Sequence, residues 1–109
     1  MENRRKERRY RIRRTGMIGD TAGAHAVETI DVSPTGARVA LDRPLLEGAD
    51  VMLSLHLPES PFGERLNADA VVIWCAEGMD VGFEVGLRLN LPDEDKTRLA
   101  AFLADFENT

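Results

Sequence analysis

A hydrophobic pattern of period two runs along most of the chain and is broken at intervals by turn residues. It is clearest over residues 51–57, where every second residue is Val or Leu, the pattern of a strand with one buried face. Gly, Pro, Asp and Asn separate several such segments, which is typical of an all-β domain. Six strands are predicted in this way, at residues 15–18, 25–32, 37–41, 51–57, 66–75 and 82–89.

Two of these strands carry more specific expectations. Pro58 and Pro61 are expected to end the fourth strand, because proline cannot donate to a strand ladder. Residues 70–75 are apolar at consecutive positions, so we expect this strand to be central, with both of its faces buried. Cys75 is then a buried thiol, and Trp74 is assigned to packing.

The last segment of the chain changes to the helical period. Leu99, Phe102, Leu103 and Phe106 follow the spacing of one helix stripe. Pro92 suits a first helical turn, and the acidic residues 93–95 complement its positive dipole end, so a helix is predicted at about residues 92–106. The predicted fold is all-β, a six-stranded antiparallel β-barrel whose open mouth is covered by this C-terminal helix.

The length and composition indicate one ordinary soluble domain. The chain has 109 residues, 43% of them hydrophobic and 30% charged, enough for one core without a metal or disulfide. No stretch is long enough for a membrane span, and no apolar region follows the charged N-terminus. We therefore expect a cytoplasmic protein with no membrane partner, and the single Cys75 agrees with a reducing compartment.

The charge is divided sharply between an N-terminal arm, residues 1–14, and the predicted barrel domain, residues 15–109. The arm carries eight Arg or Lys and two Glu, a charge of +6, which leaves −11 for the rest of a chain whose net charge is −5. An anionic partner must therefore be met at the arm. The acidic body would repel a long nucleic acid, whereas a compact dianion could be held locally. Residues 1–9 are expected to be loosely attached until a ligand orders them.

Two short motifs stand out. One is the pair Arg9 and Arg13, four residues apart in the arm; the other is Asp31-x-Ser33-x-x-Gly36 at a strand end. Together with residues 36–39, 72–74, 85–89 and 99–103, they resemble the PilZ family of cyclic di-GMP receptors over nearly the whole chain. The resemblance implies a PilZ-type barrel, cyclic di-GMP as ligand with no other cofactor, and the following ligand residues: Arg9, Arg13, Asp31, Ser33 and Gly36.

The chemistry of these residues suits such a ligand. A guanidinium can grip phosphate oxygens or the O6 and N7 edge of guanine, and it can stack on a base. The Asp31 carboxylate can accept the N1–H and amine of guanine, and the Ser33 hydroxyl can serve a neighbouring polar atom. Gly36 lets the backbone approach the ligand and can take the positive φ that such turns often need.

Arg8 stands just before the arginine pair. In the resembled family, a basic residue at this place is associated with two mutually stacked ligand molecules, and an apolar one with a single molecule. An additional guanidinium would share the charge of the second ligand and stack on its base. The resemblance therefore implies two stacked ligands per chain.

Other interpretations follow from each motif alone. The arm could be a solvated basic tail of a nonspecific single-stranded RNA binder, and Asp31 and Ser33 could bond only to local backbone amides. A PilZ-like interaction module that does not bind nucleotide is a further alternative. His25, Asp31 and Ser33 could be written as a hydrolytic triad, but no oxyanion hole or nucleophile elbow accompanies them. We therefore expect no enzyme, and His25 and His56 lack further ligands at metal spacing.

The two motifs together favour a cyclic di-GMP receptor. Its arm is expected to become ordered on ligand binding and to change the surface that a protein partner meets. The sequence does not identify that protein partner, and no specific nucleic-acid partner is expected.

Overall fold

The computed structural model describes residues 8–78 and 82–107, and over these residues the chain forms the predicted strands and helix in the predicted order. The bounds of most strands extend a few residues beyond those predicted. The elements are β1 (Thr15–Asp20), β2 (Gly23–Ser33), β3 (Gly36–Leu41), β4 (Asp50–Ser60), β5 (Gly63–Glu77), β6 (Phe83–Asn90) and α1 (Asp93–Glu107).

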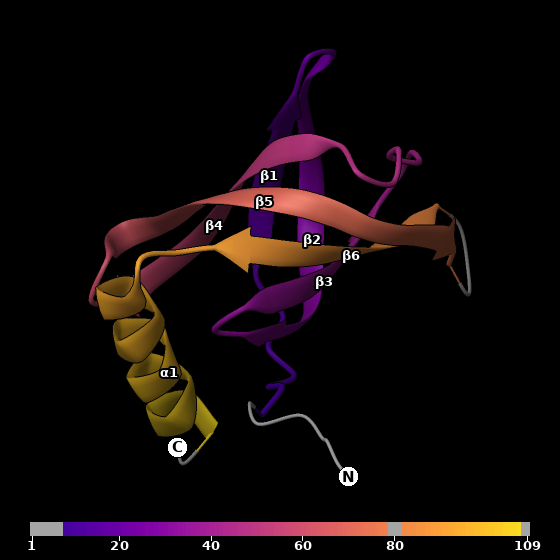
Figure 1. Ribbon diagram of the computed structural model, residues 1–109. Coiled ribbons are helices and arrows are strands. Elements are labelled where there is room, and N and C mark those ends of the chain that lie inside the picture. Colours follow the sequence, from indigo (N-terminus) through magenta and orange to yellow (C-terminus); the bar gives the residue numbers. More distant parts are fainter. Residues whose placement is uncertain (1–7, 79–81, 108–109) are drawn as a thin grey trace, which may run out of the picture.

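The six strands form a closed antiparallel barrel. The strand order around the barrel is β1-β2-β3-β6-β5-β4, with β4 paired back to β1; Figure 1 labels the six strands. Closure gives each of the six described strands a neighbouring strand on both sides. The predicted fold class is therefore confirmed.

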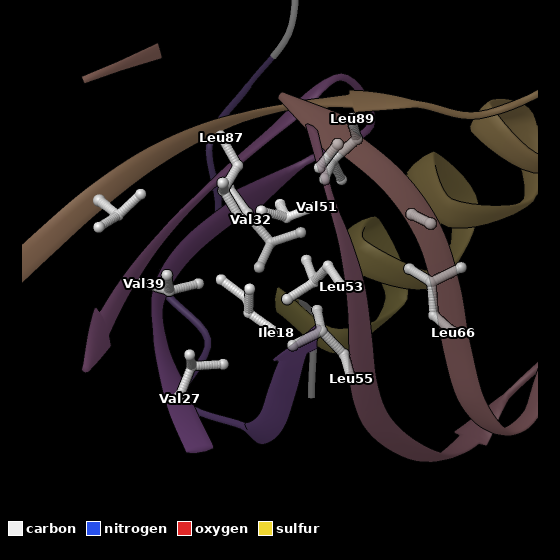
Figure 2. Packing of buried hydrophobic residues seen from close by; sticks show 14 of the residues in the cluster. Ile18, Val27, Val32, Val39, Val51, Leu53, Leu55, Leu66, Leu87 and Leu89 are labelled. Carbon is white, nitrogen blue, oxygen red and sulfur yellow. The ribbon is translucent and has the colours of Figure 1, made fainter. Parts of the chain in front are cut away.

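The core of the barrel is built from the alternating apolar positions. Ile18, Val39 and Leu53 are fully buried and lie in the cluster drawn in Figure 2. Leu99 and Leu103 of α1 belong to the same cluster, so the predicted helix stripe does pack against the barrel. Figure 1 shows α1 beside the barrel, next to the end of β6. Within the described residues no helix is long and apolar enough to span a membrane.

Pro58 does not end the fourth strand as expected, whereas Pro61 does directly follow its last residue. β4 continues through Pro58 to Ser60, and the pairing of β4 with β5 is irregular between His56 and Ser60. A proline is compatible with a strand at such an irregularity because no ladder hydrogen bond is required of it there.

The expectation that residues 70–75 are buried on both faces was also wrong. Ile73 and Trp74 are 46% and 37% exposed, and Cys75 is only partly buried. β5 has β4 as a register partner only as far as Val71, so residues 74–77 pair with β6 alone. Phe102 and Phe106 of α1 lie instead with Arg14 and residues 56–59. A register shift between Val72 and Trp74 also disturbs the alternation of side chains there.

The second half of the arm packs on the barrel. The backbones of Tyr10 and Val32 exchange two hydrogen bonds of 2.9 Å, and the Thr29 N–H donates to the Arg14 carbonyl over 2.8 Å. Ile12 is buried in the core, and its carbonyl accepts the Thr29 hydroxyl. The packed chain therefore begins at Tyr10, before the expected domain boundary at Thr15, and residues 1–7 of the arm lie outside the described residues.

Candidate functional site

A β-bulge sets the direction of Asp31. Strict alternation from Thr29, which is 1% exposed, would turn Asp31 into the core. The register of β2 against β3 shifts between these two residues, so Asp31 instead stands opposite Arg38. Because the adjoining Val39 is fully buried, Arg38 and its partner Asp31 lie on the outer face of the barrel. The bulge thus moves a carboxylate from the core side to the surface side.

Two guanidinium groups hold the Asp31 carboxylate, one on each oxygen. Arg9 Nη1 lies 3.1 Å from Oδ1, and Arg38 Nη2 lies 3.0 Å from Oδ2. The Asp31 side chain is only 9% exposed, whereas those of Arg9 and Arg38 are 48% and 35% exposed. A carboxylate this buried needs such partners. The contact with Arg9 brings the two sequence motifs together across 22 residues of chain.

Ser33 and Gly36 shape the turn between β2 and β3. The Gly36 N–H donates to Ser33 Oγ over 3.1 Å, and the Leu89 N–H donates to the Thr35 carbonyl over 2.8 Å. The expected positive φ at Gly36 is not found, since its φ lies outside the left-handed region. Glycine is needed for another reason: a Cβ there would lie 3.0 Å from the Leu87 carbonyl oxygen, closer than real Cβ contacts ordinarily come.

Arg13 is not part of this cluster. Its Nη1 lies 3.2 Å from Glu28 Oε1, and the two side chains are 77% and 47% exposed. The two arginines of the arm motif thus pair with different carboxylates. An ion pair as exposed as this one contributes little to stability, about 0–1 kcal/mol, so Arg13 can leave Glu28 for another anion at small cost.

A groove that three arginines line, the positive groove, lies along the arm. Its volume is about 420 Å³, and it is lined by Arg8, Arg9, Tyr10, Arg11 and Phe106. The guanidinium carbon of Arg8 lies 5.7 Å from the centre of the Tyr10 ring. The turn residues Asp31, Ser33 and Gly36 do not line this groove. Arg9 alone belongs both to the groove and to the Asp31 cluster, and it therefore connects the two halves of the candidate site.

Arg38, which pairs with Asp31, was not among the site residues expected from the sequence, and Trp74 was assigned to packing. Trp74 covers Gly86, where a Cβ would clash with the indole ring, and Gly86 is the register partner of Arg38. The sequence does hold a signal for Arg38, because alternation after Gly36 places it on the polar face of a strand leaving the motif turn. Only the cross-strand register brings it to Asp31.

The hydrolytic triad considered from sequence is not assembled. His25 Nε2 lies 3.2 Å from Asp20 Oδ1, near the start of β2, whereas Asp31 and Ser33 lie near the end of that strand. The N–H of Ala22, which donates to Asp20, and secondarily His25 hold the pKa of the Asp20 carboxyl below its usual value. In the described part of the chain no group of three or more metal-ligating side chains comes together.

Comparison with known families and structures gives one consistent result. The family model described as PilZ domain matches residues 3–105. The PilZ domain of YcgR from Escherichia coli, solved with c-di-GMP, is similar at a TM-score of 0.77 and 16% identity, over 97% of this chain and 93% of that one. Among curated protein sequences no match was found.

Two similar structures are larger proteins. The inhibitor of motility MotI/DgrA of Bacillus subtilis has a TM-score of 0.82 and 17% identity over 97% of this chain. The MrkH–c-di-GMP complex of Klebsiella pneumoniae has a TM-score of 0.73 and 19% identity over 96% of this chain. The chain spans about half of each, 52% and 53%. At these identities the likeness shows the shared fold.

Proposed function

The chain belongs to the PilZ domain family, and we propose that it is a cyclic di-GMP receptor that holds its ligand between the arm and the turn from β2 to β3. The observation that carries this proposal is the contact of Arg9 with Asp31. It places a guanidinium and a carboxylate from two distant motifs in one cluster on the barrel surface. Relatives of the same fold, YcgR and MrkH, were solved with c-di-GMP, which supports the choice of ligand.

Each proposed ligand residue has a chemical role. Arg9 and Arg13 bind phosphate oxygens or the O6 and N7 edge of guanine, because both are exposed enough to exchange a carboxylate partner for the ligand. Asp31 accepts the N1–H and amine of guanine. Ser33 and Gly36 keep the turn in the shape that aims Asp31.

Arg8 extends the proposed site to a second ligand. It lines the positive groove and is exposed, so its guanidinium can stack on a base and share the charge of a second molecule. We propose two stacked ligands per chain. The groove volume lies within the range of small-molecule sites.

The proposed output is a change in the arm. Binding would neutralise part of the +6 charge of residues 1–14 and change the contacts of Arg8 and Arg9, so that a protein partner meets a different surface.

Titration calorimetry tests the proposal. Cyclic di-GMP is titrated into the wild type, Arg9→Ala and Asp31→Ala, with GTP and a short RNA as control ligands. Arg65→Ala is the matched control, since Arg65 is exposed and its guanidinium bonds to Ser54 on neighbouring strands. We expect binding by the wild type and the control, and losses of about tenfold or more in the two site variants.

A wild type that ignores the dinucleotide would overturn the proposal. RNA binding that depends steeply on salt and survives Asp31→Ala would favour the RNA-binding alternative instead. The same titrations test the stoichiometry. We expect two ligands per wild-type chain and one in Arg8→Leu, and a wild type that saturates at one ligand contradicts the stacked pair.

A further inference from the structure

Arg38 lies in a row of residues that crosses the outer face of four neighbouring strands. Asp31 of β2 pairs with Arg38 of β3, Arg38 with Gly86 of β6, and Gly86 with Trp74 of β5. The indole of Trp74 covers Gly86. The Asp31 carboxylate is therefore bound to an arginine of β3, a strand that pairs with β2 on one side and β6 on the other.

The two cations on Asp31 are held very differently. Arg38 projects from the middle of a paired strand, and its Nη1 lies 3.7 Å from Glu84 Oε1. Its Nε is buried and has no hydrogen-bond partner among the described residues, so the inner end of the guanidinium is packed rather than solvated. Arg9 instead precedes Tyr10, where pairing begins, and about half of its side chain is exposed. Arg9 can therefore leave Asp31 more easily than Arg38 can.

We propose that Arg38 is the positioning residue of the site: it keeps Oδ2 of Asp31 in place while Arg9 exchanges Oδ1 for the ligand. This inference rests on the proposed cyclic di-GMP function. A carboxylate has about four lone-pair positions, so Asp31 can retain Arg38 and still accept two N–H groups from one guanine. In the absence of Arg38, Arg9 could take both oxygens in a bidentate pair and cover the acceptors that guanine needs.

The consequence is selectivity for guanine. Guanine offers donors at N1 and at its exocyclic amine, whereas adenine has an acceptor at N1 that a fixed carboxylate repels. Cyclic di-AMP has the same phosphates and riboses as cyclic di-GMP, so the ratio of the two affinities measures base recognition separately from phosphate binding. A residue that only stabilises the barrel would change both affinities together.

The test compares the two ligands by calorimetry in the wild type, Arg38→Gln, Arg38→Lys and the control Arg65→Gln, with circular dichroism to verify folding. For Arg38→Gln we expect about a tenfold loss of affinity for cyclic di-GMP and little change for cyclic di-AMP. Arg38→Lys keeps a cation and should retain more of the selectivity, and Arg65→Gln should match the wild type. If Arg38→Gln does not fold, Arg38→Met, which keeps the packed stem, takes its place.

A ratio of affinities that stays at the wild-type value in the folded, uncharged Arg38 variant overturns the inference, even where both affinities fall together. That outcome differs from the failure of the proposed function, in which the wild type itself binds no cyclic di-GMP.

Discussion

The two ion pairs on Asp31 should contribute unequally to the stability of the folded chain. Double-mutant cycles that combine Asp31→Ala with Arg9→Ala or with Arg38→Ala measure each contribution. Exposed ion pairs couple by about 0.2–1 kcal/mol, and hydrogen bonds to charged groups contribute about 1.5–3 kcal/mol when better buried. Arg38 is the less exposed cation and projects from a paired strand, whereas Arg9 is 48% exposed. We expect couplings of about 1.5 kcal/mol for Arg38 and about 0.5 kcal/mol for Arg9.

Urea unfolding measures these couplings. Trp74 is the single tryptophan of the chain, so its fluorescence reports unfolding without a label. Circular dichroism provides a second probe, which is needed because Trp74 covers Gly86 beside Arg38, so its fluorescence also responds to local changes around Arg38. Raising the salt concentration should reduce the Arg9 coupling more than the Arg38 coupling, because the more exposed pair is the more strongly screened.

A coupling for Arg9 that equals or exceeds that for Arg38, by both probes and at low salt, would refute this reasoning. It would mean that the arm, rather than β3, fixes the position of the carboxylate. The division between an exchangeable and a permanent cation would then be incorrect.

Three further predictions follow from single positions. Gly36→Ala should destabilise the fold by about 1 kcal/mol, measured as a lower Tm, because the new Cβ meets the Leu87 carbonyl oxygen at 3.0 Å; an unchanged Tm would show that β3 and β6 separate freely. Leu99→Ala should cost about 2–5 kcal/mol in urea unfolding, since Leu99 is fully buried, and a loss below 1 kcal/mol would mean that α1 adds little to the core. The pKa of the Asp20 carboxyl is lowered in the folded chain, mainly by the Ala22 N–H. This carboxylate therefore stabilises the fold at pH values above its ordinary pKa of 3.8 and loses that effect as the pH falls through the lower folded pKa. The difference in unfolding free energy between wild type and Asp20→Asn should shrink on acidification, and a constant difference would contradict the lowered pKa.

The strands could be predicted from the sequence because their signals are local. Alternation over residues 51–57 and the turn residues between segments depend on near neighbours in the chain, and the barrel buries one face of each strand. The errors came where pairing decides the outcome. Pro58 is accommodated at an irregularity between β4 and β5. Ile73 and Trp74 remain partly exposed where the register of β5 against β4 has ended and its register against β6 shifts.

The candidate site was only partly visible in the sequence for the same reason. The motifs identify Arg9 and Asp31, and the structure brings these two together. The bulge after Thr29 cannot be seen without the pairing of β2 with β3, although it determines which face Asp31 occupies. Arg38 becomes part of the site through that same register, and it carries no motif of its own.

The bulge therefore links the arm to recognition, because it makes one carboxylate serve two purposes. Asp31 binds Arg9 of the arm, and in the proposed receptor it also accepts hydrogen bonds from guanine. The ligand must therefore displace Arg9 or share the Asp31 carboxylate with it. The free energy of the Arg9 pair is then subtracted from the free energy of binding. A pair of about 0.5 kcal/mol lowers the affinity only about twofold, whereas one of about 3 kcal/mol would lower it more than a hundredfold. An arm that a ligand controls thus requires a weak ion pair between the half-exposed Arg9 and Asp31. Arg38 on the barrel forms the stronger ion pair, which Asp31 keeps when the ligand binds.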